Sequence, residues 1–501
     1  MDAPHLRVAI IGSGFAGIGT AVRLQQDGTE NFLLFERAAD LGGTWRDNSY
    51  PGCACDVPSH LYSFSFAPNP RWTHTYSRQQ EIWQYLRDVA DRYAVTPKIR
   101  YGHEVLAATW EDAAQRWRVE TTKGTWTADV LVSGAGALSE PSVPPLPGLE
   151  TFAGTAFHSA QWDHEHDLGG RDVAVVGTGA SAIQIVPELQ KQARRLVVFQ
   201  RTPPWIVPRR DRPLRPWEHR LYSALPPAQR GVRALVWAVR ELFLSPFLQP
   251  RAGGRNERLA QRHLAAQVRD PELRAKLTPS YRMGCKRVLL SNDYYPALQQ
   301  PNVELVTERI REIRPHAIVT DDGVEHEVDT IVLATGFKVT ELPISERIRG
   351  RDGRTLAETW RGSPKAHLGT TVAGFPNLFI LLGPNTGLGH TSVVFMIEAQ
   401  IEHVRAALKA MRRAGARTVE PRPEAQEAFV AAIDAKMQST VWLAGGCSSW
   451  YVDKTGRVST IWPDYTLPFK RRLAKFDPSE YVLGGAPQQT PAAPAAPAAV
   501  G

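Results

Sequence analysis

Two short apolar runs, each followed by a glycine-rich turn, stand out in the hydrophobic pattern of the chain. Residues 6–11 lead into Gly12-Ser13-Gly14-Phe15-Ala16-Gly17, and residues 173–176 lead into Gly177-Thr178-Gly179-Ala180-Ser181-Ala182. A helix-like segment follows each turn, so each unit predicts a buried strand, a tight turn and a helix. Glycines at this spacing let the pyrophosphate of a dinucleotide approach the free N–H groups of a helix N-terminus. The sequence therefore predicts two dinucleotide-binding units.

The residue that ends the next apolar run differs in charge between the two units. Residues 32–35 lead to Glu36, whereas residues 196–199 lead through Gln200 to Arg201 and Thr202. An acid at this strand end binds a free ribose 2′-hydroxyl, whereas an arginine pairs with a 2′-phosphate. We therefore expect FAD in the first unit and NADPH in the second. Such a pair implies hydride transfer from nicotinamide to flavin.

Weaker patterns predict the elements between and after these units. Residues 103–110 and 117–122 are typical of a hairpin, residues 127–133, 330–334 and 378–382 of strands, and residues 397–411 of a helix. Residues 211–280 are rich in Arg, Leu and Ala at helical spacing, which indicates a helical insertion. Within it, one helix face would carry Leu235, Val239, Leu242 and Phe243. We expect this face to cover a substrate entrance and not a membrane, with a plain packing helix as the alternative.

Together these elements predict an α/β fold with two Rossmann-like dinucleotide-binding domains and a helical insertion. Residues 1–145 and 338–483 would form a discontinuous FAD-binding domain, and residues 146–210 and 281–337 an NADPH-binding domain. Residues 211–280 would form the insertion. The Ala/Pro/Gln-rich tail, residues 484–501, is expected to be disordered because it cannot bury a core.

Composition narrows the class of protein. The apolar content of 43% is that of a soluble globular protein. With no long uncharged apolar stretch and no signal-peptide pattern at its start, the chain is expected to be cytoplasmic, without an integral membrane span. The net charge of +8 comes from scattered arginines, so nucleic acid is not an expected partner, although a positive field would help to attract NADPH.

The four cysteines are too few for a disulfide scaffold and fit a reducing cytosol. Cys53-x-Cys55 has the spacing of neither a zinc site nor a thiol redox site. We therefore expect a structural role for this pair and no metal site.

A longer motif lies between the two units. Residues 152–163 read Phe152-Ala-Gly154-Thr-Ala-Phe-His158-Ser-Ala-Gln-Trp162-Asp163. This segment resembles the fingerprint F-x-G-x-x-x-H-x-x-x-W-[P/D] of type I Baeyer–Villiger monooxygenases, a family of class B flavoprotein monooxygenases. Related enzymes that oxidise nitrogen or sulfur usually depart from it at the last two positions. The resemblance implies that His158 lies in a linker and couples domain motion.

Further resemblances to this family extend over nearly the whole chain. Gly43-Thr44-Trp45, Tyr50-Pro51-Gly52 and Asp56 resemble a segment near the flavin, and the family pattern also implies that Tyr62 and Val105 lie against FAD. Arg201-Thr202 resembles the pair that binds the 2′-phosphate, where Lys286 would assist. Arg287 resembles the active-site arginine, and Trp450 a tryptophan whose indole reaches the nicotinamide ribose. After Trp450 the chain departs from the best-known branch, so no substrate preference is carried over.

The resemblance implies a definite reaction. NADPH would reduce FAD, and the reduced flavin would capture O2 as a C4a-peroxyflavin. As an anion, this would attack a small-molecule ketone to give an ester or lactone. A permanently charged Arg287 would stabilise the negative charge, and Asp56 would orient Arg287.

Three other functions are weighed against this one. An N- or S-oxidising flavin-containing monooxygenase would share the fold and both cofactors, but Trp162-Asp163 argues against it. A disulfide reductase would need redox cysteines at another spacing. A non-catalytic dinucleotide-binding protein would not need the cations Arg201, Lys286 and Arg287 together.

Overall fold

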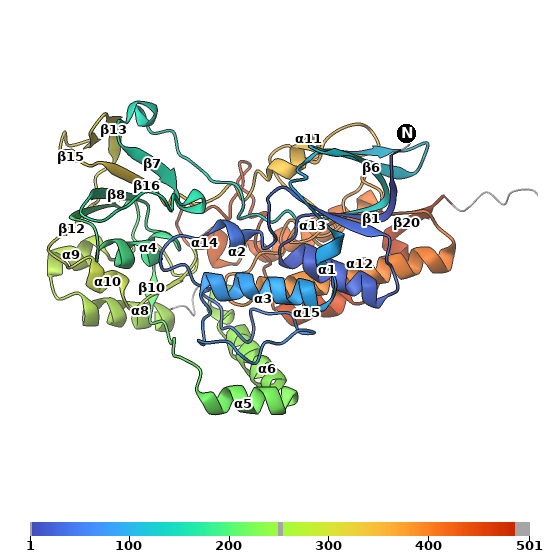
Figure 1. Ribbon diagram of the computed structural model, residues 1–501, viewed down its shortest axis with the longest axis horizontal. Helices are drawn as coiled ribbons and strands as arrows, with labels where there is room; N and C mark the ends of the chain where they lie inside the picture. The colour runs from blue at the N-terminus through green and yellow to red at the C-terminus, as the bar shows by residue number, and fades with distance from the viewer. Residues whose placement is uncertain (1–2, 249–253, 486–501) are drawn as a thin grey trace, which may run out of the picture.

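The computed structural model describes residues 3–248 and 254–485. Two sheets occupy opposite ends of the molecule (Figure 1). The strand order of the first is β17 (Ile348–Arg349), β4 (Val105–Glu111), β5 (Arg116–Thr121), β6 (Gly124–Ser133), β1 (His5–Ile11), β2 (Phe32–Glu36) and β3 (Ile99–Tyr101), and β18 (Leu378–Ile380) also pairs with β6. The second is wholly parallel, in the order β12 (Val303–Val306), β9 (Arg195–Phe199), β8 (Asp172–Val176), β16 (Thr330–Leu333) and β7 (Thr155–His158).

Both predicted nucleotide units form a strand, a turn and a helix. In the first, β1 leads through the glycine turn into α1 (Phe15–Gln26), and β1 pairs in parallel with β2. In the second, β8 leads into α4 (Ala182–Leu189), and β8 pairs in parallel with β9. A Cβ atom at Gly17 would lie 2.0 Å from the carbonyl oxygen of Gly12, so only glycine lets α1 approach the turn this closely. Strands buried on both faces explain the continuous apolar runs.

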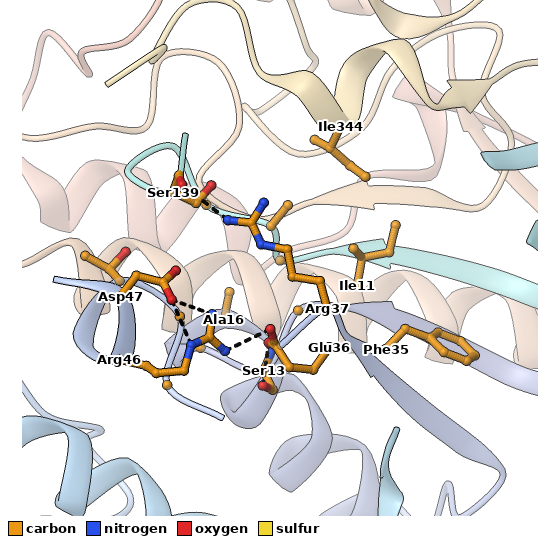
Figure 2. Close-up of a pocket in the computed structure, with 18 of the residues that line it drawn as sticks. Ile11, Ser13, Ala16, Phe35, Glu36, Arg37, Arg46, Asp47, Ser139 and Ile344 are labelled. Carbon is orange, nitrogen blue, oxygen red and sulfur yellow. Dashed lines mark hydrogen bonds and ion pairs between the residues drawn. The ribbon is translucent and has the colours of Figure 1, made fainter. Parts of the chain in front are cut away.

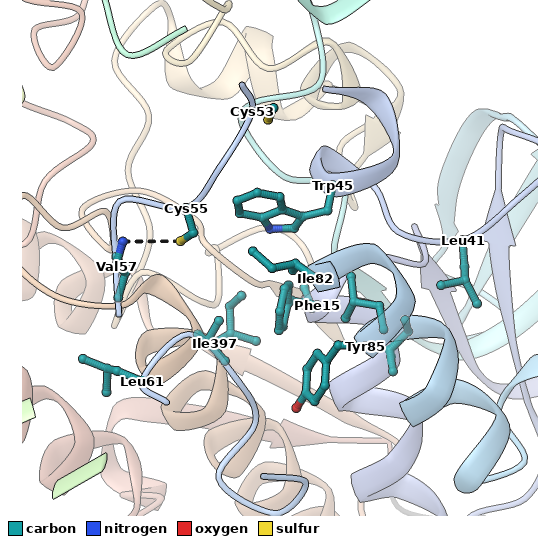
Figure 3. Close-up of a cluster of buried hydrophobic side chains, with 14 of the residues drawn as sticks. Phe15, Leu41, Trp45, Cys53, Cys55, Val57, Leu61, Ile82, Tyr85 and Ile397 are labelled. Carbon is teal, nitrogen blue, oxygen red and sulfur yellow. Dashed lines mark hydrogen bonds between the residues drawn. The ribbon is translucent and has the colours of Figure 1, made fainter. Parts of the chain in front are cut away.

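Long helices cover the first sheet. α1 contacts α3 (Gln79–Arg92) and α12 (Val393–Ala414), and α12 contacts α15 (Thr466–Leu473). α12 is longer than predicted because the Ser392 hydroxyl caps its first turn and Gly415 ends it at a φ of 60°. Figure 3 shows Phe15, Trp45, Ile82 and Tyr85 gathered in the core that these helices share with loop residues 53–61.

The predicted insertion is helical. It comprises α5 (Pro216–Ala224), α6 (Pro226–Leu242), α7 (Ser245–Leu248), α8 (Gly254–Gln267) and α9 (Pro271–Lys276), and Figure 1 shows α5 and α6 projecting from the body. A role over a substrate entrance stays a prediction, whereas the alternative, a plain packing helix, is wrong for the predicted apolar face. Its members are exposed, by 64% for Leu235, 44% for Val239, 75% for Leu242 and 49% for Phe243.

The inward side of α6 carries both kinds of group: Val232, Val236 and Trp237 pack against the main core, and polar side chains form buried hydrogen bonds beside them. Arg233 donates hydrogen bonds to the carbonyl oxygens of His60 at 2.9 Å and Ser63 at 2.8 Å. The buried Glu241 accepts hydrogen bonds from the backbone N–H of Thr466 at 2.9 Å and from its hydroxyl at 2.8 Å. These charge-assisted bonds act together with the apolar contacts, such as the stacking of Trp237 on Phe395, to orient the helix.

Two further predictions need correction. Cys285 and Cys447 form a disulfide, although they lie 162 residues apart, which differs from the expectation that the cysteines fit a reducing cytosol; Cys53 and Cys55 are free and buried. The predicted tail begins too early, because β20 (Tyr481–Gly484) pairs with β19 (Thr418–Pro421). The rest of the tail, residues 486–501, lies outside the described residues.

The remaining elements are short or lie around the two sheets. They are α2 (Thr44–Asp47), β10 (Ile206–Val207), β11 (Leu289–Leu290), α10 (Tyr294–Ala297), β13 (Ile310–Arg314), β14 (Ala317–Thr320), β15 (Glu325–Glu327), α11 (Leu356–Trp360), α13 (Pro423–Met437) and α14 (Val441–Ala444), with 3₁₀ turns at Thr96–Lys98, Leu149–Thr151, Ser159–Gln161, Pro343–Glu346 and Pro478–Glu480. None of the helices in residues 3–248 and 254–485 has the length and apolar character needed to cross a membrane.

Candidate active site

A cavity opens where β1 and β2 end and α1 begins (Figure 2). The structure brings most of the predicted FAD-binding residues to its wall, namely Gly12, Ser13, Gly14, Phe15, Ala16, Glu36, Thr44, Trp45, Tyr62 and Val105. Gly17 instead packs α1 against the turn. The first turn of α1 holds no acidic residue, and no side chain caps it. Its backbone N–H groups are therefore free to bind an anionic group such as a pyrophosphate.

Glu36 is fixed at the end of β2. Its carboxylate accepts hydrogen bonds from the backbone N–H of Ser13 at 3.1 Å and from the Ser13 hydroxyl at 2.7 Å. Arg46 pairs with the other carboxylate oxygen at 2.9 Å and with Asp47 at 2.6 Å (Figure 2). The sequence prediction missed Arg46, although it directly follows Gly43-Thr44-Trp45. This arrangement fixes Glu36 at the wall of the cavity.

The second glycine turn is open in the same way. Gly177 adopts a φ of +113°, and a Cβ atom at Gly179 would meet nothing within 4 Å. No side chain caps α4, whose N-cap is Ser181, and its first turn holds no acid. The Thr178 hydroxyl donates a hydrogen bond to the carbonyl oxygen of Thr202 at 3.1 Å, which joins the turn to the segment after β9. Ala180 is exposed at the tip.

Two cations lie beside this turn. Arg201 is exposed, and Lys286 has a lowered pKa because it is partly buried and because Arg201 is nearby. Within the described part of the chain, neither forms an ion pair with a carboxylate. A repulsive pair of unneutralised cations is the arrangement that a phosphate dianion stabilises.

Arg287 and Asp56 form an ion pair between the two nucleotide units. Nε and Nη2 of Arg287 lie 2.7 and 2.6 Å from the same carboxylate oxygen of Asp56. Burial acts to raise the pKa of Asp56, but the charge and hydrogen bond of Arg287, together with the charge of Arg240, outweigh burial, so this pKa is lowered. The pKa of Arg287 is raised, mainly by the charge of Asp56. Both groups are therefore ionised over the physiological range.

Three other residues singled out in the sequence are Trp450, His158 and Trp162, and each has a defined environment. Trp450 is 45% exposed and contacts the ring of Tyr451, with 4.3 Å between the ring centroids, so its indole is not part of the core. His158 is buried at the end of β7, where its Nδ1 accepts a hydrogen bond from the N–H of Ala160 at 3.1 Å. Trp162 packs on Phe157 with 5.1 Å between the rings.

This fold and site define a class. The chain combines two strand–turn–helix units open to a dinucleotide with an ionised arginine–carboxylate pair, which is the combination expected of a flavoprotein oxidoreductase that uses a second dinucleotide. Residues 9–226 match the family model described as pyridine nucleotide-disulphide oxidoreductase.

Comparison with known proteins narrows the class to one family. The chain is 52% identical to a Baeyer–Villiger monooxygenase of Streptomyces coelicolor over 97% of this chain and 94% of the relative. Its fold is similar to that of cyclohexanone monooxygenase from Rhodococcus sp. Phi1 bound to NADP+, with 30% identity, a TM-score of 0.87, and coverage of 97% of this chain and 100% of that one. It is also similar to OTEMO in complex with FAD and NADP, with 27% identity, a TM-score of 0.85, and coverage of 94% and 97%. The chain belongs to the Baeyer–Villiger monooxygenase family, which confirms the predicted resemblance and fold class.

Proposed function

We propose that this enzyme, a flavoprotein monooxygenase of the Baeyer–Villiger type that uses FAD, NADPH and O2 to convert ketones into esters or lactones, relies on Arg287 as its catalytic residue and on Asp56 to orient it. The observation that carries the proposal is the bonding of two Arg287 nitrogens to one oxygen of Asp56. The flavin, when bound, supplies the redox chemistry of oxygen insertion. Arg287 stabilises negative charge on oxygen next to the flavin without titrating.

The other residues bind and orient the two dinucleotides. The α1 N-terminus and Glu36 hold the pyrophosphate and ribose of FAD, with Thr44, Trp45, Tyr62 and Val105 along the same cavity. The turn at residues 177–181 holds the NADPH pyrophosphate, and Arg201, Thr202 and Lys286 hold its 2′-phosphate. Trp450 covers the nicotinamide ribose, which its exposed indole supports.

A cytoplasmic location is part of this proposal, because NADPH is a charged reductant that does not cross membranes freely. Cell fractionation tests it: the enzyme is expected in the cytosolic fraction, and recovery outside the cell membrane would contradict it.

An NADPH-depletion screen tests the function. Cyclic, linear, aryl and steroidal ketones are incubated with enzyme, NADPH and O2, and the products are identified by mass; an amine and a sulfide are included. We expect a ketone product that is heavier by one oxygen atom. Oxidation of the amine or sulfide with no ester from any ketone would favour an N- or S-oxidising enzyme instead.

A further inference from the structure

The segment that leads to Asp56 is held on one side by backbone pairing within the flavin-binding domain. Ala54 lies opposite Arg78 in an antiparallel bridge. Two backbone hydrogen bonds of 2.9 and 3.0 Å between residues 53–55 and 77–79 close this bridge. In a bridge of this kind, the N–H and carbonyl groups of Ala54 itself point away from Arg78. Ala54 is buried, so both groups need partners on the other side.

The side-chain amide of Gln184 supplies both partners. Its Oε1 accepts a hydrogen bond from the N–H of Ala54 at 3.3 Å, and its Nε2 donates one to the carbonyl oxygen of Ala54 at 2.9 Å. The same Oε1 accepts a hydrogen bond from the hydroxyl of the buried Tyr50 at 3.1 Å. The amide thus takes the place of a neighbouring strand, and both lone pairs of its oxygen are used.

Gln184 belongs to the other nucleotide unit. It lies in the first turn of α4, three residues after the N-cap Ser181. This end of α4 carries the turn, residues 177–181, to which we assign the NADPH pyrophosphate. The backbone of α4 also approaches the flavin-binding domain here, since a Cβ atom at Gly52 would lie 2.6 Å from the carbonyl oxygen of Gln184. The first turn of α4 is therefore in direct contact with the segment that leads to Asp56.

A short path connects this contact to the ion pair. Asp56 follows Ala54 by two residues, and one of its oxygens lies 2.7 and 2.6 Å from two nitrogens of Arg287. The carboxylate keeps this place only while the backbone before it is fixed. A displacement of about 1 Å at a reacting group can cost about 100-fold in rate.

We infer that Gln184 is a positioning residue that transmits the binding of NADPH at the N-terminus of α4 to Asp56, and through Asp56 to Arg287. The inference rests on the proposed function, in which Arg287 is the catalytic residue. Without this amide both units keep their folds, but bound nucleotide no longer steadies the segment that carries Asp56. The enzyme then forms less ester and more hydrogen peroxide per NADPH, while NADPH still reduces the flavin.

Replacing Gln184 with leucine keeps a side chain of similar size and removes all three hydrogen bonds. The matched control is Gln190→Leu, because the Gln190 amide donates a hydrogen bond to Asn302 at 3.2 Å within the NADPH-binding unit. We expect Q184L to lower the ester-to-peroxide ratio about tenfold, with the rate of flavin reduction and the KM for NADPH close to wild type. Q190L should keep the wild-type ratio, and an equal loss in both variants would overturn the inference.

A second substitution, Gln184→Asn, keeps an amide but shortens the side chain by one methylene group. Its shorter reach should weaken the pairing with Ala54, so we expect an ester-to-peroxide ratio between those of wild type and Q184L. If Q184L does not retain FAD, Q184N decides the question alone. A wild-type ratio in Q184N, or in a folded Q184L, would overturn the inference.

Hydrogen–deuterium exchange of the FAD-loaded enzyme, with and without saturating NADP+, gives a readout that does not depend on turnover. In wild type, NADP+ should slow exchange in residues 177–186 and also in residues 50–58. In Q184L or Q184N, NADP+ should slow exchange in residues 177–186 with a smaller effect on residues 50–58. Undiminished protection of residues 50–58 in these variants would overturn the inference. The proposed function fails separately, if Arg287→Ala keeps the wild-type ester-to-peroxide ratio.

Discussion

Glu36 and Arg201 follow matching strands, β2 and β9, yet they meet opposite surroundings. Glu36 is buried and held by Ser13 and Arg46, whereas Arg201 is exposed beside Lys286. A carboxylate fixed in this way suits a neutral ribose hydroxyl, and two neighbouring cations suit a phosphate. These two positions carry the difference between the two nucleotide units.

Arg201→Ala should raise the KM for NADPH and leave that for NADH nearly unchanged. Loss of a charge-assisted phosphate contact costs about 1.5–3 kcal/mol, or roughly ten- to a hundredfold in affinity. Steady-state kinetics with both cofactors measures the effect, and Lys191→Ala, at an exposed lysine after α4 at the opposite end of the same sheet, serves as the control. Equal increases for NADPH and NADH would assign Arg201 a general rather than a phosphate-specific role.

Arg287→Ala should abolish ester formation while NADPH still reduces the flavin in part. Removal of one fixed donor from a developing oxyanion costs about 10²–10³ in rate. Asp56→Ala should give a milder form of the same defect, because Asp56 contacts Arg287 and not the oxyanion. The ester and hydrogen peroxide formed per NADPH, together with stopped-flow flavin reduction, separate the two half-reactions. An R287A enzyme with wild-type coupling would move the catalytic role elsewhere.

At the scale of elements, α6 has its apolar side facing outward. Helical periodicity predicts which residues share a face, and Leu235, Val239, Leu242 and Phe243 do share one. Periodicity does not predict whether this face is directed toward the protein or toward solvent, because the direction depends on residues far away in the chain. Arg233 bonds to residues 60–63 and Glu241 to residue 466, and these bonds set the orientation together with the packing of Val232, Val236 and Trp237 on the core.

Neighbouring residues of α6 should therefore respond differently to substitution. Leu242→Gln/Phe243→Gln should leave the free energy of unfolding and the ketone profile close to wild type, because both side chains are exposed. Glu241→Ala should lower the free energy of unfolding by about 1–3 kcal/mol, since it leaves the buried N–H of Thr466 without its acceptor. Denaturant unfolding of the variants measures both effects. A large loss of stability in the double variant would show that the face is covered in solution.

The sequence predicts those features of the fold that depend on neighbouring residues alone. The turns at Gly12 and Gly177 depend on positive φ angles and on close approach of a helix, which neighbouring residues determine. The Cys285–Cys447 disulfide and the hydrogen bonds of Arg233 to residues 60 and 63 join segments more than 160 residues apart. No spacing within either segment indicates such a meeting, so these features appear only in the folded structure.

At the scale of the whole molecule, two buried histidines make stability depend on pH. Burial lowers the pKa of both His60 and His403 to about 4, from 6.5 for an exposed imidazole. His403 is held between the Tyr481 hydroxyl at 2.7 Å and the carbonyl oxygen of Leu473 at 3.3 Å. Between pH 6.5 and 4 the unfolded chain binds more protons than the folded one, so stability falls as the pH falls.

Each histidine should contribute a loss of about 3 kcal/mol at pH 4 relative to pH 7. Urea unfolding at pH 7, 5.5 and 4.5 measures this loss. His403→Gln should be less stable at pH 7 but show a shallower pH dependence, whereas His5→Gln, at an exposed histidine, should follow wild type. Identical pH slopes for H403Q and wild type would show that His403 does not titrate as its burial requires.

The pairing of β18 with β6 bears on how the chain folds as it is made. Residues 131–133 of β6 pair with β1 on one side, but on the other side they pair only with residues 378–380, so that edge has no strand beside it until about 250 more residues have been synthesised. At about 5–20 residues per second, the nascent chain carries this apolar edge open for roughly 12–50 seconds. An open edge of buried-type residues is a template for wrong pairing. Production at low temperature or with abundant chaperone should therefore raise the yield of folded enzyme without changing its activity per bound flavin.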